Sequence, residues 1–269
     1  MPYLCADFKS FLEPNLDRAT FIQHFLKRIG LSCPVIPIDG KKHLLVSFKK
    51  TQYNPLFKIK TVIAHYDRVP NSPGANDNSS SVFSLLKFAE RLVNRPGIHN
   101  IRMIFSDGEE EAEKGVVSQG AYGLAQLFKK LGLTRDDIFV FDCMGRGTIP
   151  VLTETNFSNK VSQSFLKEFN ELESRAENLL KGATGGKWIK APCNLSDNAG
   201  FIANGIPAVA ITMLPSDEAD GLLLFDRRPA SWELLHTPND NFESLEEKSF
   251  EITATILDQL ANLRTLAKQ

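Results

Sequence analysis

The chain has 269 residues, a formal net charge of −1 and 42% hydrophobic residues. This length and hydrophobic content are sufficient for one large buried core, and the nearly balanced charge gives no sign of a nucleic-acid or anionic-membrane partner. No apolar stretch approaches the roughly 20 residues of a membrane-spanning helix, and residues 1–7 lack the basic and continuous apolar segments of a secretory signal. We therefore expect a cytoplasmic protein with no nucleic-acid or membrane partner. The sequence does not indicate an oligomeric state.

The N-terminal part of the chain predicts one helix and one β-hairpin. Residues 16–29 have apolar side chains at helical spacing, and the pattern stops at Gly30, a common end for a helix. Residues 33–38 and 43–48 are apolar runs on either side of Asp39-Gly40, a dipeptide that favours a tight turn.

The rest of the chain predicts an α/β fold. Continuous apolar runs, typical of parallel strands that are covered on both faces, occupy residues 61–64, 101–105, 138–141 and 207–213. Helical spacing predicts covering helices over residues 79–93, 159–180 and 245–266. The connections 181–194 and 214–232 are expected to be irregular segments that shape the substrate pocket. The apolar run 222–225 within the second connection either lines a pocket for a hydrophobic side chain or has only a packing role.

Histidines and carboxylates stand at or after the ends of these strands. They are His65, Asp77, Glu109, Glu110, Asp142 and His236. In open α/β sheets, ligands bind outside the carboxyl ends of the strands, so these side chains are expected to meet at one edge of the sheet.

Their chemistry is that of a zinc centre. Imidazole and carboxylate are ligands that zinc accepts in sites that stay open to water. Two zinc ions about 3.5–4 Å apart need a bridging ligand, normally a carboxylate, together with terminal ligands that leave room for a water-derived nucleophile. The residues therefore indicate a two-zinc hydrolase.

The motifs that contain these residues occur in a specific order. They are His65-Tyr66-Asp67, Gly74-Ala75-Asn76-Asp77-Asn78, Glu109-Glu110, Asp142 and His236-Thr237-Pro238-Asn239-Asp240, with Ser196-Asp197 and Gly205-Ile206-Pro207-Ala208 before the last strand. From about residue 61 to residue 245 the chain resembles the co-catalytic zinc aminopeptidases of metallopeptidase family twenty-eight. The resemblance implies a single catalytic domain over residues 1–269, with three α/β/α layers and a mixed, mostly parallel central sheet.

The resemblance also implies a role for each residue. Asp77 would bridge two zinc ions, with His65 and Asp142 on one ion and Glu110 and His236 on the other. Glu109 would be the general base, and Asp67 would orient the His65 ring. The implied activity is hydrolysis of the N-terminal peptide bond of a peptide substrate by a two-zinc-activated hydroxide.

The sequence departs from the family pattern after the glutamates. Glu111 follows Glu109-Glu110, so an assignment shifted by one residue, with Glu110 as base and Glu111 as ligand, also stays open. The preceding residues 105–108 favour Glu109 as base and Glu110 as ligand. Residues 111–114 form a short insertion before Gly115, and the usual Gly-Ser is changed at Ser118-Gln119.

Two other functions are compatible with the same motifs. A glutaminyl cyclase similar to these peptidases would bind one zinc and close N-terminal glutamine into a ring, but the segment 74–79 has the peptidase form. A non-catalytic binding domain on this fold is the third reading, which the complete ligand set opposes.

Each motif taken alone has an ordinary explanation. His65-x-Asp67 fits a surface turn, Asp77 a turn or helix cap, and residues 109–113 a solvated acidic run. Asp142 could simply open a loop, and His236 could be a plain loop histidine. The joint order of the motifs outweighs these separate readings.

The remaining histidines and the cysteines are expected to be structural. His24, His43 and His99 have no carboxylate motif around them. Cys5, Cys33, Cys143 and Cys193 lack C-x-x-C spacing, which argues against a zinc ribbon or a disulfide framework. Cys143 is expected to point away from the metals, because neighbouring strand residues face opposite sides.

Overall fold

The computed structural model describes residues 3–157, 161–194 and 196–267. Its eight strands form one sheet in the order β1-β2-β4-β3-β5-β8-β6-β7. The strands are β1 Val35–Ile38, β2 Lys41–Val46, β3 Lys60–His65, β4 Ile101–Ser106, β5 Asp137–Phe141, β6 Ile149–Thr153, β7 Ile189–Ala191 and β8 Ala208–Leu214. The α-helices are α1 Ala6–Phe11, α2 Arg18–Arg28, α3 Ser81–Val93, α4 Gly120–Lys130, α5 Gln163–Thr184, α6 Asn198–Ala203, α7 Ser216–Phe225, α8 Ala230–Leu234 and α9 Glu247–Asn262.

The centre of the sheet is parallel. Strands β4, β3, β5 and β8 are parallel neighbours, whereas β1 with β2, β2 with β4, and β6 with β8 are antiparallel. Every residue of β3, β5 and β8 is buried, which explains why these strands have continuous apolar runs rather than alternation. The predicted mixed, mostly parallel α/β fold is confirmed.

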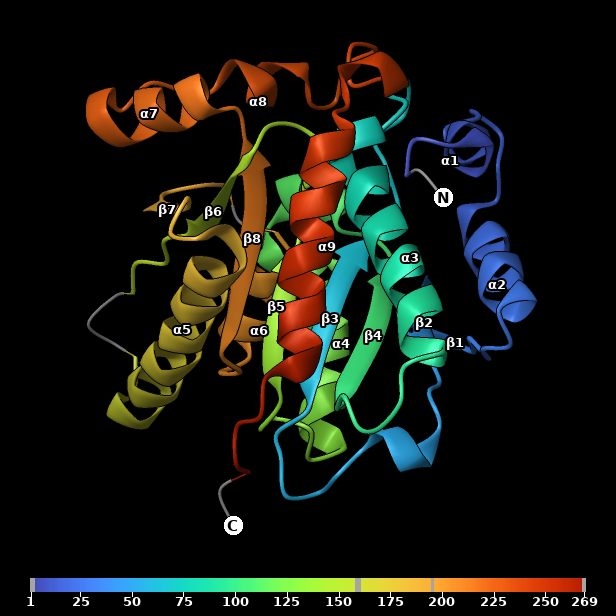
Figure 1. The fold of residues 1–269 in the computed structure, drawn as a ribbon, viewed down its shortest axis with the longest axis vertical. Helices are drawn as coiled ribbons and strands as arrows, with labels where there is room; N and C mark the ends of the chain where they lie inside the picture. The colour runs from blue at the N-terminus through green and yellow to red at the C-terminus, as the bar shows by residue number, and fades with distance from the viewer. Residues whose placement is uncertain (1–2, 158–160, 195, 268–269) are drawn as a thin grey trace.

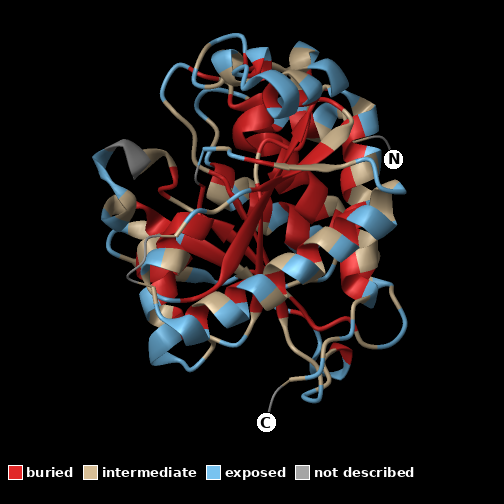
Figure 2. Cartoon of the chain, turned by 90° about the vertical axis from the view of Figure 1, so that its left-hand side faces the viewer, coloured by how far each residue is buried: buried red, intermediate tan, exposed pale blue. Residues whose placement is uncertain are grey.

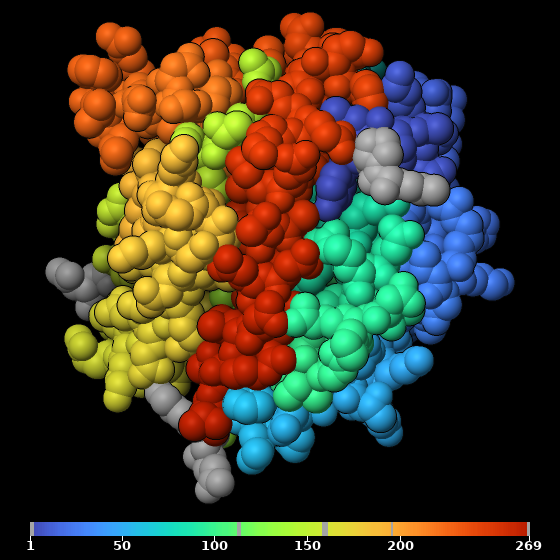
Figure 3. Space-filling view, viewed as in Figure 1, coloured from blue at the N-terminus to red at the C-terminus, as the bar shows by residue number. Residues whose placement is uncertain are grey.

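Helices cover both faces of the sheet. Figure 1 shows α3, α9 and α5 side by side in front of the sheet and α4 and α6 behind it, and the front helices close over that face in the space-filling view of Figure 3. One apolar cluster joins the sheet to α2, α3, α5 and α9, and a second joins it to α4 and α6. The strands accordingly form the buried centre in Figure 2.

The predicted N-terminal helix and hairpin are present. Helix α2 begins at the N-cap Asp17, whose side chain accepts a hydrogen bond from the Thr20 backbone N–H at 3.1 Å. Strands β1 and β2 pair across the turn at Asp39 and Gly40, both of which have positive φ. The turn residues therefore allow the hairpin that the sequence predicts.

Two predicted helices have different bounds in the structure. Helix α9 ends at Asn262, not at residue 266, because Leu263 is extended and Leu266 pairs with Phe57 in an isolated β-bridge. Helix α5 runs on to Thr184, ended by the left-handed Gly185; of its predicted start, residues 159 and 160 lie outside the described residues.

The two connections predicted to be irregular contain regular structure. The first, residues 181–194, contains the end of α5 and strand β7, and the second, residues 214–232, contains α7 and the start of α8. Of the apolar run in the second connection, Leu222 is buried, whereas Leu223, Leu224 and Phe225 are exposed. In the part of the chain that the structure describes, no helix is both long and apolar enough to cross a membrane.

Candidate metal centre

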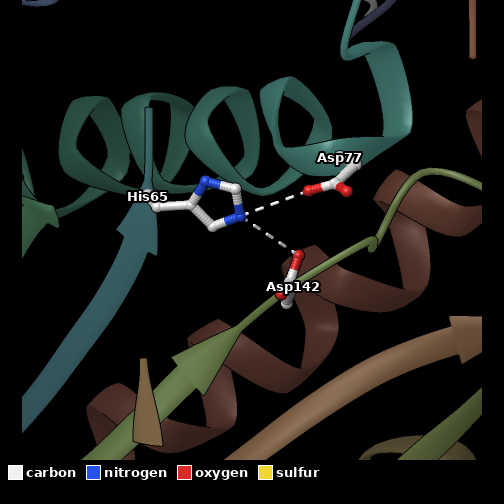
Figure 4. Close-up of side chains that lie close together, drawn as sticks. All are labelled: His65, Asp77 and Asp142. Atoms are coloured by element: carbon white, nitrogen blue, oxygen red, sulfur yellow. Dashed lines mark ion pairs between the residues drawn. The ribbon is translucent and has the colours of Figure 1, made fainter. Parts of the chain in front are cut away.

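Five of the predicted residues meet beyond the carboxyl ends of the central strands. His65 Nε2 lies 3.2 Å from Asp77 Oδ1 and 3.6 Å from Asp142 Oδ1, as Figure 4 shows. His236 Nε2 lies 3.1 Å from Asp77 Oδ2 and 3.1 Å from Glu110 Oε2. We call the first trio the His65 cluster and the second the His236 cluster; in each, the candidate ligand atoms lie within 4.8 Å of one another. Asp77 belongs to both clusters and gives one oxygen to each.

The spacing and bonding of these atoms fit bound metal ions. Two ligand atoms at zinc–ligand distances of about 2.0–2.1 Å and a tetrahedral angle are separated by about 3.3 Å, close to the contacts in both clusters. His65 Nε2, Glu110 Oε1 and Asp142 Oδ1 are buried and have no hydrogen-bond partner among the described residues. Buried polar atoms rarely lack a partner, and a cation at each cluster would supply it.

The loop after β3 holds Asp77 in place. Asp77 lies in the π-helical turn Ala75–Ser80, within which Asp77 and Asn78 have non-helical φ and ψ. The backbone N–H groups of Asn76 and Asp77 donate to the two carboxylate oxygens of Asp240, at 2.7 and 3.1 Å. Asp240 is 1% exposed. The sequence interpretation gave it no role, although its position in H-T-x-x-D was the available signal.

Two asparagines connect this loop to the segment that follows β5. The Asn78 side chain donates to the Phe141 carbonyl at 2.9 Å and accepts from the Cys143 N–H at 3.2 Å. Asn76 Oδ1 accepts from the Gly145 N–H at 2.8 Å. These bonds bracket Asp142, so they fix its position relative to Asp77.

Asp67 connects His65 to the two glutamates. Its Oδ1 lies 3.5 Å from His65 Nδ1, and its two oxygens accept hydrogen bonds from the backbone N–H groups of Glu109 and Glu110 at 3.2 and 3.1 Å. A metal-binding imidazole commonly has its other nitrogen next to a carboxylate. The predicted neighbour of the His65 ring therefore also supports the turn that presents Glu109 and Glu110.

Glu109 and Glu111 lie in different surroundings. Glu109 is 8% exposed, lines the pocket at the clusters, and accepts a hydrogen bond on Oε1 from Gln119 Nε2 at 3.0 Å. The Glu111 side chain is 45% exposed and pairs with Lys41 at 3.5 Å and Lys114 at 3.6 Å, outside both clusters. This geometry is compatible with Glu109 as the base and Glu110 as the metal ligand, and it places Glu111 outside the candidate ligands.

The carboxylates favour the charged form of the histidines. Complete burial opposes the charged form of His65, but the adjacent carboxylates of Asp142, Asp67 and Asp77 outweigh it and raise the pKa of His65 well above its usual value. Hydrogen bonds with Asp77 and Glu110 raise the pKa of His236 to about 10. Protons therefore occupy the histidines when metal is absent, and metal binding must displace them.

Burial shifts two carboxyl groups beside the clusters toward their neutral forms. Burial raises the pKa of Glu109 to about 9; nearby Asp142, Asp197 and Asp77 add to the shift, and His65 opposes it. Asp197 is fully buried, and its Oδ2 accepts a hydrogen bond from the Ser106 hydroxyl. Burial raises the pKa of Asp197 to about 7. Bound cations would reverse this preference, because positive charge favours the ionised carboxylates.

A pocket of about 340 Å³ opens beside the clusters. Its lining comprises four carboxylates and His236 together with Cys143, Thr153, Cys193, Asn194, Ser196, Ala210, Ile211, Thr212, Arg228, Trp232 and Leu235. Cys143 was predicted to point away from the metals, but it lines this pocket. Strand β5 ends at Phe141, and Cys143 has a φ of 54°, so strand alternation does not apply to it.

The other histidines are structural or exposed, as predicted. His43 and His99 are fully buried, and each accepts a backbone hydrogen bond on Nδ1, from Asp107 and Ile101 respectively. His24 is exposed on α2.

The mostly parallel α/β sheet and the two clusters that share one carboxylate fit a zinc metallopeptidase. The chain belongs to peptidase family M28, whose family model matches residues 48–261.

Comparisons with known proteins agree with this family membership. Aminopeptidase YwaD of Bacillus subtilis is 41% identical over 66 residues, which are 24% of this chain and 14% of the relative. Glutaminyl cyclase of Porphyromonas gingivalis has a TM-score of 0.70 at 17% identity, over 97% of this chain and 95% of that structure. A Zn-dependent exopeptidase of Parabacteroides distasonis has a TM-score of 0.69 at 18% identity, over 97% and 96%. These two structural similarities establish the shared fold.

Proposed function

We propose that the protein is a metal-dependent aminopeptidase that hydrolyses the N-terminal peptide bond of peptides. The observation that carries the proposal is the sharing of Asp77 between the His65 cluster and the His236 cluster. A carboxylate with one oxygen directed to each of two trios is suited to a pair of adjacent divalent ions.

Each residue has a role in this proposal. Asp77 would be shared by two zinc ions, His65 and Asp142 would hold one ion with it, and Glu110 and His236 would hold the other. When bound, the ions polarise the scissile carbonyl and lower the pKa of a water molecule.

Glu109 moves the proton in this proposal. Its carboxylate accepts a proton from the attacking water and passes it to the leaving amine. The Gln119 amide, which donates to Glu109 Oε1 at 3.0 Å, leaves Oε2 as the oxygen for this transfer. The acidic side chains around the clusters also suit the ammonium group of a peptide N-terminus, because opposite charges attract strongly where water is scarce.

The test compares metal content and turnover in three variants. Glu109→Gln is expected to retain both metal ions and to lose at least about 100-fold in kcat, the usual share of a general base. Glu110→Gln is expected to lose metal. Glu111→Gln, the matched control, is expected to retain both metal and activity, because its side chain pairs with Lys41 and Lys114. Normal turnover by Glu109→Gln would move the base to another residue.

The same assay separates the two other functions. The substrates are aminoacyl amides and peptides with N-terminal glutamine, followed for free amino acid and for ammonia. One bound zinc with ammonia release from glutaminyl peptides would identify a cyclase. A folded protein without stoichiometric metal after dialysis would indicate a binding domain.

A further inference from the structure

We propose that Arg228 selects substrates whose N-terminal residue has an acidic side chain, glutamate or aspartate. This inference rests on the proposed aminopeptidase function and names its substrate class. Arg228 lines the pocket beside the metal clusters and is the one lysine or arginine among the described residues of that lining.

The pocket is suited to a single polar side chain. Its volume of about 340 Å³ is at the small end for ligand sites, so it has room for about one residue next to the clusters. Thr153 on β6 and Thr212 on β8 line its wall from neighbouring antiparallel strands. A terminal residue held at the clusters would place its side chain against this wall.

The guanidinium of Arg228 is available for a ligand. The structure assigns it neither a hydrogen bond nor an ion pair with any described residue, although Glu109, Glu110, Asp77 and Asp142 line the same pocket. An arginine fork matches a carboxylate with two parallel hydrogen bonds. An acidic substrate side chain would complete this pairing.

The backbone on both sides of Arg228 is fixed. Arg227 donates its N–H to the Gly221 carbonyl at 3.1 Å, beyond the end of α7. Pro229 is buried, and the Ser231 N–H donates to Glu218 Oε2 at 2.9 Å, which ties the start of α8 to α7. A residue before proline is also restricted to extended conformations. These constraints hold the Arg228 backbone in place, so binding a ligand would order only its side chain.

Charge explains why the arginine is needed for this class of substrate. The pocket brings four carboxylates together, and two divalent ions would balance their formal charge without leaving positive charge for a further carboxylate. An acidic side chain entering such a pocket meets like charges, which raise its free energy. A cation at Arg228 offsets this repulsion, whereas a neutral side chain does not require it.

The test compares N-terminal residues on one scaffold. The substrates are X-Ala-Ala-amides in which X is Glu, Asp, Gln, Leu or Lys, so every C-terminal carboxylate is blocked. We expect kcat/KM of the zinc-loaded wild type to be highest for Glu or Asp. Arg228→Gln is expected to lower kcat/KM for Glu and Asp by about tenfold, the scale of a charged pair weakened by solvent, and to leave Leu unchanged. Arg228→Glu is expected to favour Lys.

Arg227→Gln is the matched control. Arg227 is adjacent in sequence, is also exposed, and lies over the Phe225 ring at 5.1 Å instead of lining the pocket. This variant is expected to keep the acidic preference. A preference for Gln over Glu in the wild type, or equal losses for all substrates in Arg228→Gln, would overturn the assignment.

A binding measurement separates this inference from the proposed function. Calorimetry with L-glutamate and L-glutamine on the zinc-loaded protein is expected to give about tenfold tighter binding of glutamate, and Arg228→Gln is expected to abolish the difference. If no peptide is hydrolysed, the aminopeptidase proposal fails, and calorimetry still decides the role of Arg228. Equal affinities in the wild type would overturn it.

Discussion

The carboxylate of Asp67 lies 3.5 Å from Nδ1 of His65, on the side of the ring opposite Asp77 and Asp142. The imidazole is therefore placed between carboxylates on both of its nitrogens. Because Asp67 also accepts the backbone N–H groups of Glu109 and Glu110, one side chain positions groups that belong to both clusters.

Replacing Asp67 should weaken metal binding without unfolding the protein. Asp67→Asn is expected to lower zinc affinity by about 10–100-fold, the usual effect of removing a carboxylate behind a metal-binding histidine. Competition with a chromophoric chelator measures this. The control is Asp217→Asn, an exposed residue in the first turn of α7; equal affinities for both variants would contradict the role of Asp67.

Metal affinity should fall as the pH is lowered. The pKa values of His65 and His236 are raised, that of His236 to about 10, so both imidazoles carry protons at neutral pH in the metal-free protein. Metal binding must release these protons, and acid therefore competes with the metal. Titration calorimetry in buffers of different ionisation enthalpy should detect proton release at pH 7; zinc uptake without it would argue against the histidine ligands.

Without metal, the protein should become less stable as the pH rises from about 4 to about 7. Burial raises the pKa values of Asp197 and Asp240 to about 7. A carboxyl whose folded pKa is raised stabilises the fold fully below its unfolded value near 4, and this contribution is lost as the pH rises through about 7. Chelator-treated protein should accordingly show a falling Tm over this range, and Asp197→Asn should flatten the slope. A Tm that rises would be inconsistent with these shifts.

Removing the Asp240 side chain should loosen the loop that carries Asp77. Asp240→Ala leaves the Asn76 and Asp77 N–H groups without their acceptors and is expected to lower the free energy of unfolding by about 1–3 kcal/mol. Metal content should also fall, since Asp77 serves both clusters. Urea unfolding of the metal-free protein gives the first quantity, and Asn239→Ala, at an exposed neighbouring position, is the control. Unchanged stability would show that the loop holds without Asp240.

The N-terminal helices should depend on Phe83. Its ring lies 4.5 Å from the Phe8 ring and 5.4 Å from the Phe11 ring, centroid to centroid, and the side chain is fully buried. Phe83→Ala is expected to cost about 3–5 kcal/mol, the usual range for a large aromatic in a core. Phe225→Ala, at a position that is 64% exposed, should change the unfolding free energy by less than about 0.5 kcal/mol.

Much of the fold and of the candidate site was predictable because local sequence patterns indicated it. Strands such as β3 and β5 are buried on both faces, so their apolar runs end where the polar site residues begin. The joint order of His65, Asp77, Glu110, Asp142 and His236 located the clusters, and the structure brings all five together.

The missed features depend on tertiary contacts or on weak local signals. Gln119 and Ser106 act through side-chain bonds to Glu109 and Asp197, which no local pattern reveals. Asp240 had a local signal in its H-T-x-x-D position, but its role depends on bonds to the distant Asn76 and Asp77. Helix α7 lies in a connection that was expected to be irregular. Gly221 and the two aspartates Asp217 and Asp220 reduce its helix propensity, although Pro215 and the acidic first turn are start signals. Leu263 and Leu266 continue the apolar spacing of α9, but pairing with Phe57 takes Leu266 out of the helix.

Arg18 shows that the part of the chain before the family match also supports the centre. Its guanidinium donates to the Tyr66 and Pro73 carbonyls and to the Ser79 hydroxyl, so it joins both ends of the loop that contains Asp77. A version of the protein trimmed to residues 48–261 would lack this arginine and expose three acceptors beside the metal ligands. Expression of the matched region alone would therefore remove a support of the loop that carries Asp77.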